Sequence, residues 1–358
     1  MTSRAGGHDS AVNIVFAQGR DVPSWEQRHA SGLIPDRWPY GLDGVTRHFS
    51  EARAVEVGPL RPLRLLRALT SRRESQGGAG QKTISLSWEE DVALRMLEQY
   101  PAEVALSGVI WATDPPESMA ARLKQRLSRR ALRRMSLVWT LSKPQVEVVE
   151  RWLGAGGPPV RYLRFGVDHE FFAEKPFPST PMLFSAGGDR DRDPATLFRA
   201  IEIIRREHPS IEVMVQSRTQ LQPPDGVRVV PYLTHQQLRE AYERASVVAI
   251  ATRPNLHASG MTVSLEAMSV GRPVVITETP GLDDYVRDGD TGFLVPCNDH
   301  RALAARIGTL LEDHAAAEAM GGRARRRVVA SFTSAQMADE LAAFARSAGG
   351  DTRTPVKS

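Results

Sequence analysis

The chain of 358 residues has room for two ordinary domains, and its 41% apolar and 25% charged residues are typical of a globular protein. Its net charge of +4 is too small to indicate a nucleic-acid binder, and no apolar run reaches the about 20 residues of a membrane span. The single cysteine, Cys297, excludes an internal disulfide, and residues 1–10 lack an apolar signal core. We therefore expect a cytoplasmic protein that binds an anionic ligand or an anionic surface.

In the N-terminal half, short apolar runs alternate with helical patterns. The alternation fails in residues 24–81, where Gly, Pro and Arg are dense, and residues 71–82 are expected to form a mobile loop. We expect this region to shape the entrance of a cleft. The predicted strands are 12–17, 83–86, 106–111, 137–141 and 160–164, and the predicted helices are 90–99, 117–134 and 143–153.

Residues 166–178 are predicted to link two domains, because Pro176 and Pro178 stiffen the chain before a new strand. The same alternation then returns. The predicted strands are 182–186, 211–215, 227–230, 246–251, one that starts at Pro273, and 293–295. The predicted helices cover 197–204, 236–244, 260–270, 281–287, 302–311, 318–329 and 335–345.

This order predicts an α/β protein with two doubly wound parallel sheets. We expect an N-terminal domain over residues 1–170 and a C-terminal domain over residues 171–332. A last helix and a tail follow in residues 333–358, and the pattern leaves open whether that helix returns to the first domain.

Residues 247–277 read as strand, loop, helix and strand, which is a ligand-binding unit of an open α/β sheet. The helix N-terminus offers free N–H groups to an anion, so we predict that Gly260, Met261 and Thr262 contact a diphosphate. An ordinary N-cap by Ser259 is the alternative. Further along the helix, Glu266 could accept hydrogen bonds from a diol, the alternative being an exposed carboxylate. Phosphate and diol together describe a nucleotide diphosphate sugar.

Two motifs at a fixed separation now point to a family. Residues 264–275 (SLEAMSVGRPVV), followed by Gly281 and residues 288–295 (DGDTGFLV), resemble the donor-site region of glycosyltransferase family 4, the group 1 glycosyl transferases. Residues 141–145 and 165–168 resemble the end of that family's first domain. The resemblance implies the GT-B fold, in which two Rossmann-like domains face a cleft, the first binding the acceptor and the second the nucleotide-sugar donor.

The resemblance also implies a chemistry. A sugar would pass from a nucleotide diphosphate sugar to an acceptor hydroxyl with retention of configuration. From the residues themselves we expect no obligatory metal or other cofactor, because no cluster of Asp, His or Cys has metal-ligand spacing. Glu266 would hold the ribose hydroxyls. Gly187 and Gly188, with Arg190 and Arg192 nearby, resemble the phosphate-binding loop, and arginine can bind phosphate through two parallel bonds. Pairing of both arginines with the adjacent aspartates is the alternative.

The sequence departs from the family pattern at three places. Ala258 stands where the family usually has the first of two glutamates, and His257 could take over a sugar hydroxyl unless it is a surface histidine. The basic pair is compressed into residues 189–193. The histidine that often follows a first-domain strand is absent, and Thr113 or Asp114 falls there.

The acceptor side is less defined. Gln18, Gly19 and Arg20 follow the first strand, where acceptor and donor phosphates would meet. Asp114 could assist an acceptor hydroxyl as a general base, and a capping role before the next helix is the alternative.

Residues 122–134 hold seven basic residues and no acid. A helix of this kind can lie on an anionic membrane. We favour the alternative, a solvated helix that packs on its own domain through Leu123, Leu127, Ala131 and Leu132.

We therefore predict a glycosyltransferase whose partners are a nucleotide-sugar donor and a small-molecule or glycan acceptor, not a nucleic acid. The alternatives are an epimerase or phosphorylase on the same fold, and a nucleotide-binding protein without turnover.

Overall fold

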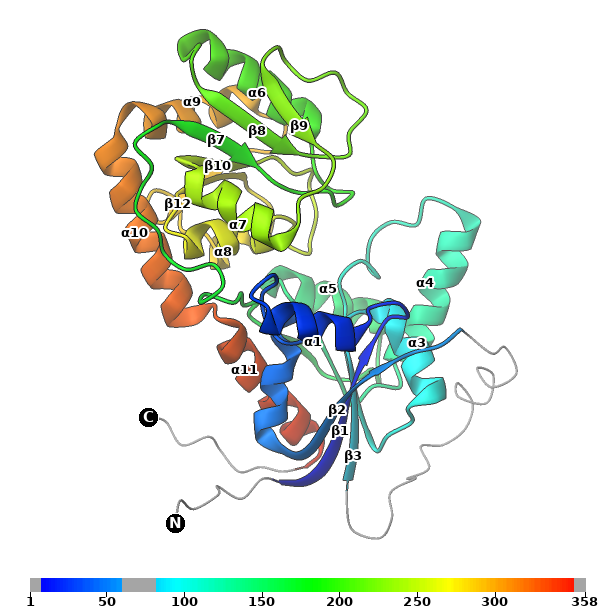
Figure 1. Ribbon diagram of the computed structural model, residues 1–358. Coiled ribbons are helices and arrows are strands. Elements are labelled where there is room, and N and C mark those ends of the chain that lie inside the picture. Colours follow the sequence, from blue (N-terminus) through cyan, green and yellow to red (C-terminus); the bar gives the residue numbers. More distant parts are fainter. Residues whose placement is uncertain (1–7, 60–81, 351–358) are drawn as a thin grey trace, which may run out of the picture. The chain divides into compact units, whose positions relative to one another are not determined.

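The computed structural model describes residues 8–59 and 82–350, which form two compact units (Figure 1). The described residues of the N-unit lie within Met1–Gln27, Arg37–Arg164 and Met337–Ser358. Those of the C-unit lie within Arg28–Asp36 and Phe165–Gln336. The mobile loop predicted at residues 71–82 falls outside the described residues, apart from Lys82.

The N-unit contains a six-stranded parallel sheet in the order β2-β1-β3-β4-β5-β6. Helices α3, α4 and α5 share one apolar core with strands of this sheet. The elements are β1 (His8–Phe16), α1 (Val22–Ala30), η1 (Pro39–His48), β2 (Phe49–Glu56), β3 (Lys82–Ser87), α3 (Glu90–Gln99), β4 (Val104–Gly108), α4 (Met119–Leu132), β5 (Leu137–Thr140), α5 (Lys143–Leu153), β6 (Val160–Tyr162) and α11 (Ser334–Ala348).

Sequence patterning missed α1, η1 and β2. Among the described strands, β2 pairs only with β1, so it lies at the edge of this sheet, and Phe49 is its only buried residue. Because most of its side chains reach water, the strand lacks the apolar alternation that identifies half-buried strands.

The C-unit contains a second six-stranded parallel sheet in the order β12-β11-β10-β7-β8-β9. In chain order this is 3-2-1-4-5-6, the arrangement of dinucleotide-binding Rossmann folds. The elements are β7 (Met182–Ser185), α6 (Pro194–Glu207), β8 (Glu212–Gln216), β9 (Val227–Val230), α7 (His235–Arg244), β10 (Val247–Ile250), α8 (Met261–Ser269), β11 (Val274–Thr277), η2 (Leu282–Asp284), β12 (Gly292–Val295), α9 (His300–Glu312) and α10 (His314–Ser331).

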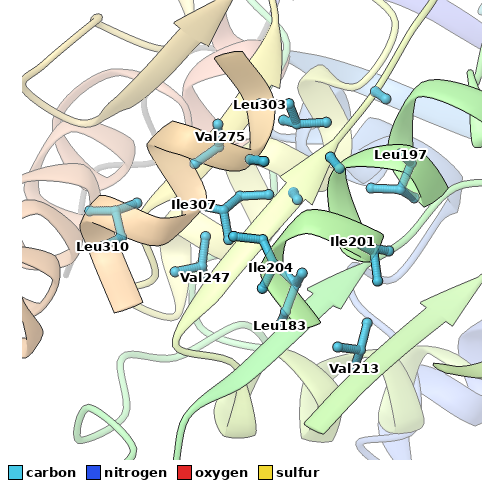
Figure 2. Packing of buried hydrophobic residues seen from close by; sticks show 14 of the residues in the cluster. Leu183, Leu197, Ile201, Ile204, Val213, Val247, Val275, Leu303, Ile307 and Leu310 are labelled. Atoms are coloured by element: carbon cyan, nitrogen blue, oxygen red, sulfur yellow. The ribbon is translucent and has the colours of Figure 1, made fainter. Parts of the chain in front are cut away.

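The main core of the C-unit lies between the sheet and helices α6 and α9 (Figure 2). Leu197, Ile201 and Ile204 of α6 meet Leu303 and Ile307 of α9 over the strands. Burying each such side chain is worth about 1.5–3 kcal/mol, so this face anchors the sheet. Helices α7 and α8 lie on the opposite side of the sheet (Figure 1).

A buried arginine ties α7 to the segment that precedes β7. The guanidinium of Arg272 donates to the carbonyls of Tyr242, Glu243, Lys175 and Pro176 at 2.8–3.1 Å. Burial lowers its pKa to about 10, against the opposing effect of nearby glutamates. Arg272, which follows Gly271 in the motif at residues 264–275, therefore joins these segments as a structural residue and is not a surface cation.

The prediction of two Rossmann-like α/β units with parallel sheets is confirmed. Several boundaries differ. The short helix predicted at 281–287 is one 3-10 turn, Leu282–Asp284, and the helix predicted at 117–134 is Met119–Leu132. The strand predicted at 106–111 is Val104–Gly108, and the helix predicted at 318–329 is His314–Ser331.

Candidate functional site

The strand order of the C-unit determines where its candidate site lies. Strands β7 and β10 are neighbours, and the chain winds outward from them in opposite directions, which is the switch point where open α/β sheets bind ligands. The loops that leave the two strands are joined by backbone bonds, since Asp193 N–H donates to Ala251 O at 2.9 Å and Arg253 N–H to Asp191 O at 2.8 Å. The sheet therefore brings the Gly-Gly loop and the loop before α8 together.

Arg192 lies where these loops meet. Its side chain is only 13% exposed, and its nearest carboxylate, Asp189, is 3.5 Å from Nη2. Nε and Nη1 are buried and have no hydrogen-bond partner among the described residues. Buried donors without a partner cost about 1–3 kcal/mol each, so these two nitrogens would gain from an acceptor outside the protein.

Two glycines make room for that guanidinium. A Cβ on Gly187 would come within 2.0 Å of Arg192 Nε, and a Cβ on Gly260 within 2.9 Å of Nη1. Both glycines have positive φ, +140° and +97°. Gly188 is exposed, and a Cβ there would meet nothing within 4 Å. Of the glycine pair predicted for phosphate, only Gly187 packs against the arginine.

Helix α8 presents an N-terminus without a side-chain cap. The N-cap is Gly260, so the alternative of a cap by Ser259 is wrong. The Ser259 hydroxyl instead donates to the Asp189 carboxylate at 3.1–3.2 Å. Met261 N–H already donates to Ala258 O at 3.1 Å. Thr262 is the only residue of α8 that is not buried, and its N–H lies in the first turn, where backbone donors have no partner within the helix.

Glu266 is buried on α8, so the alternative of an exposed carboxylate is wrong. The phenol of Tyr242 donates to its Oε2 at 2.8 Å. Burial raises the pKa of Glu266 to about 7, although the Tyr242 hydrogen bond and the positive charge of Arg192 both lower it. Contact of this carboxylate with ribose stays a prediction.

His257 is also buried, so it is not a surface histidine. Its Nε2 lies 3.2 Å from Asp191 Oδ2. Arg190 is more exposed, at 58%, and its Nε lies 3.6 Å from the same carboxylate. The predicted alternative of arginine–aspartate pairing therefore holds in part, because Asp189 and Asp191 each have an arginine within ion-pair distance.

The N-unit has its own switch point between β1 and β3. After β1, Gln18 is exposed, and Gly19 N–H donates to Glu56 Oε2 at 2.9 Å. Arg20 Nη2 donates to the Tyr40 hydroxyl at 3.1 Å, with the guanidinium carbon 5.6 Å from the ring centroid. Of the three predicted acceptor-side residues, Gly19 is thus held through its backbone and Arg20 through its side chain.

Sequence reasoning missed the partners of Arg20. Tyr40 stacks on Trp88 with ring centroids 4.6 Å apart and planes 11° from parallel. Tyr40 has φ +64°, which costs a non-glycine residue about 1–3 kcal/mol. Burial raises the pKa of Glu89, and the charge of Arg20 opposes this. The only available signal was Trp88, two residues after the strand predicted at 83–86, since Tyr40 falls in residues 24–81, where the pattern fails.

Asp114 does not cap the next helix, so that alternative is wrong. The cap of α4 is Ser118, whose hydroxyl accepts from Ala121 N–H at 3.1 Å. Asp114 lies in a loop after β4, and its carbonyl accepts from Gln125 Nε2 at 3.0 Å. The base role of its carboxylate stays a prediction.

Two buried side chains fix the loop that carries Asp114. Glu90 accepts the N–H groups of Ile110 and Trp111 at 2.9 and 2.8 Å, and burial raises its pKa to about 7. Gln145 Nε2 donates to Ile110 O at 2.8 Å. Gln145 is the last residue of the segment 141–145 that resembles the family, and the resemblance implied no role for it. It positions this loop.

No cluster of three or more His, Cys, Asp or Glu side chains is arranged for a metal ion within residues 8–59 and 82–350.

Two Rossmann-like units with parallel sheets define an α/β protein of the GT-B class. The family model described as "Glycosyl transferases group 1" matches residues 193–327, which include most of the C-unit. The predicted relation to the group 1 glycosyl transferases is confirmed.

Curated relatives agree over short stretches. The chain is 38% identical over 129 residues to the D-inositol 3-phosphate glycosyltransferase of Kineococcus radiotolerans, a match that covers 34% of this chain and 28% of that protein. It is 25% identical over 208 residues to a glycogen synthase of Mycobacterium tuberculosis, covering 54% and 50%. The matches thus span half or less of these relatives' length.

Solved structures agree over the whole fold. A sucrose-phosphate synthase from Thermosynechococcus elongatus has a TM-score of 0.68 at 16% identity, covering 96% of this chain and 100% of that one. The Anabaena protein Alr3699/HepE in complex with UDP-glucose has a TM-score of 0.65 at 13% identity, covering 94% and 99%. At these identities the likeness concerns the fold.

Proposed function

We propose that this protein transfers a sugar from a nucleotide diphosphate sugar to an acceptor hydroxyl. The observation that carries the proposal is the guanidinium of Arg192, buried with two unpartnered donors beside Gly260 at the uncapped N-terminus of α8. A diphosphate would accept from both the guanidinium and the first N–H groups of the helix. The match of residues 193–327 to group 1 glycosyl transferases supports the same reading.

The proposed catalytic role of this arrangement follows from the bond that breaks. Cleavage of the sugar–phosphate bond leaves negative charge on a nucleoside diphosphate, and fixed donors aimed at that charge are often the largest catalytic contribution. Arg192 and the N–H of Thr262 are the main donors in the proposal, with Gly260 providing close approach and Arg190 reaching from solvent. Because these groups carry the phosphate charge, the proposed reaction needs no metal.

Glu266 would bind the ribose diol. Tyr242 already occupies Oε2, which fixes the plane of the carboxylate before a ligand arrives. Hydroxyl groups that donate to the carboxylate favour its ionised form, so nucleotide binding would lower the raised pKa of Glu266. His257 would contact the donor sugar in place of the glutamate that Ala258 replaces.

The acceptor, a small molecule or a glycan, would bind to the N-unit at Gln18, Gly19 and Arg20, with the Tyr40–Trp88 pair as an apolar wall. We propose that configuration is retained and that the departing phosphate takes the acceptor proton. Asp114 would then assist the acceptor hydroxyl without being an obligatory base.

The proposal is tested first by ligand-induced stabilisation. A ligand that binds only the folded state raises its melting temperature by mass action. We expect a shift with at least one of UDP, GDP and ADP that is lost in Arg192→Gln and Glu266→Ala and kept in Arg228→Gln, an exposed arginine on β9. No shift with any of the three nucleotides contradicts the proposal.

Turnover is tested next, with the stabilising nucleotide carried on a panel of sugars, with and without EDTA. Product formation from an acceptor panel, undiminished by EDTA, is expected. Ala258 at the glutamate position is the observation that favours the second candidate, a nucleotide-binding protein without turnover. Nucleotide binding with no transfer, hydrolysis or epimerisation of any donor would establish that candidate instead.

A further inference from the structure

Helix α4 presents a face that its own unit does not use. Its buried residues, Ser128, Ala131 and Leu132, lie on the side that packs against the N-unit. Leu123, which the sequence pattern assigned to the packing face, is instead 59% exposed, and Met119 is 74% exposed. The expectation that α4 packs through Leu123 is therefore wrong.

Three arginines share that outward face. Residues three or four apart on a helix are neighbours, so Arg122, Arg126 and Arg130 form one row beside Met119 and Leu123. All three arginines are exposed, and no described side chain forms an ion pair with them. We name these five residues the outward face of α4.

The remaining basic residues of the helix have identified partners. Lys124 pairs with Asp91 at 2.7 Å, and Arg129 and Arg133 donate to the carbonyl of Leu153. The nearest acid on the neighbouring helix α3, Asp91, is thus taken by Lys124. Helix α4 itself contains no Asp or Glu, so the positive charge of the outward face is not neutralised from within its own helix.

We propose that the outward face of α4 docks the protein on an anionic phospholipid surface. A row of arginines suits the phosphates of lipid headgroups, and two large apolar side chains on the same face can enter the region between headgroups and acyl chains. A nucleic acid or an acidic protein loop would satisfy the arginines but leave Met119 and Leu123 in water. None of the described helices is long and apolar enough to cross a membrane, so the contact is peripheral.

The test is sedimentation of the full chain with vesicles of phosphatidylcholine alone or mixed with phosphatidylglycerol. We expect binding only to the mixed vesicles, weakened by salt. The triple variant Arg122→Gln, Arg126→Gln, Arg130→Gln should lose about 100-fold in vesicle affinity, since each basic residue near an anionic surface contributes about fivefold. The matched control removes three exposed arginines from the C-unit, Arg199→Gln, Arg206→Gln and Arg301→Gln, and should bind as the parent chain does.

The apolar part of the face is tested separately with Met119→Ser and Leu123→Ser together. This pair keeps every charge and should weaken vesicle binding at least fivefold, without changing the melting temperature. Equal loss in the control triple variant would show a general charge effect and overturn the proposal. So would an unchanged affinity in the serine pair together with tight, salt-sensitive binding of RNA, which would assign the face to a polyanion instead.

Discussion

The hydroxyl of Tyr242 on α7 donates to Oε2 of Glu266 on α8 at 2.8 Å, and both residues are buried. The ring of Tyr242 is itself fixed in place, because the rings of Phe172 and Phe184 pack against it edge to face. The carboxylate that we propose as the ribose contact therefore has a fixed orientation, set by a residue 24 positions away in the sequence.

Loss of the Tyr242 hydroxyl should change how nucleotide binding depends on pH. The hydrogen bond lowers the pKa of Glu266, which burial raises to about 7. In Tyr242→Phe that pKa moves up, so less carboxylate is ionised near neutral pH. We expect nucleoside diphosphate affinity to fall several-fold at pH 6.5 and much less at pH 8.5, measured by calorimetry at both values. A uniform loss at both pH values would indicate a purely structural role for Tyr242.

Because of Glu266, the free energy of unfolding should fall as the pH rises. Its pKa is about 7 in the folded chain against an ordinary value of 4.5, so the folded state keeps a proton that the unfolded chain releases between these values. The stabilising contribution is complete below pH 4.5 and lost as pH rises to 7. Glu266→Gln should gain about 3 kcal/mol in unfolding free energy over the parent between pH 4.5 and pH 8, by urea denaturation. An equal pH slope in both proteins would contradict this, whereas nucleotide affinity should fall in the variant at every pH.

Alanine at the two glycines beside Arg192 should remove nucleotide binding through the arginine. In Gly187→Ala the new Cβ would lie 2.0 Å from Arg192 Nε, and in Gly260→Ala it would lie 2.7 Å from Ile276 Cδ1 and 2.9 Å from Arg192 Nη1, so the guanidinium must shift in both. The positive φ adds strain of about 1 kcal/mol or more. We expect at least a tenfold loss of nucleoside diphosphate affinity. Gly188→Ala is the control one residue away, since its Cβ would meet nothing within 4 Å, and its affinity should match the parent's.

Loss of the contact between Arg20 and Tyr40 should change the KM for the acceptor rather than the KM for the donor. Tyr40→Phe keeps the ring that stacks on Trp88 but removes the acceptor of the Arg20 hydrogen bond. Once a transferred sugar and acceptor are known, the variant should raise KM for the acceptor several-fold while KM for the donor stays within twofold. A change in donor KM alone would remove Arg20 from the proposed acceptor side.

Arg272 should be essential for folding rather than for chemistry. In Arg272→Met four carbonyls lose their donor in a buried place, which should cost about 3–5 kcal/mol of unfolding free energy. Arg228→Met on the exposed face of β9 should change it by less than about 0.5 kcal/mol. Equal chemical denaturation midpoints for the two variants would show that the hydrogen bonds of Arg272 are dispensable for stability.

Much of the fold could be predicted from the sequence, because many buried strands are short apolar runs near glycine or proline. The helices at Glu90–Gln99 and Lys143–Leu153 begin and end where the pattern predicts. Strand β2 was not readable, since an edge strand with exposed side chains shows no alternation.

The candidate site was only partly readable. Gly260 and Glu266 stand out because a glycine before a helix and a lone carboxylate within it break an otherwise apolar pattern. The hydrogen bond from Tyr242 and the two unpartnered donors of Arg192, Nε and Nη1, could not be predicted, since both depend on which segments the sheet order brings together. The same holds for Met119 and Leu123, because helical spacing alone does not say which side of α4 faces its unit.

By itself, the amino-acid sequence determined the alternation of strands and helices, the glycine-rich loops and the resemblance to group 1 glycosyl transferases, because these depend on residues close together in the chain. Only the tertiary structure decided which charges are buried, which arginines lack partners and which apolar side chains meet water. Those properties arise when segments tens of residues apart pack together and exclude solvent. A local sequence pattern does not show which side chains that packing buries.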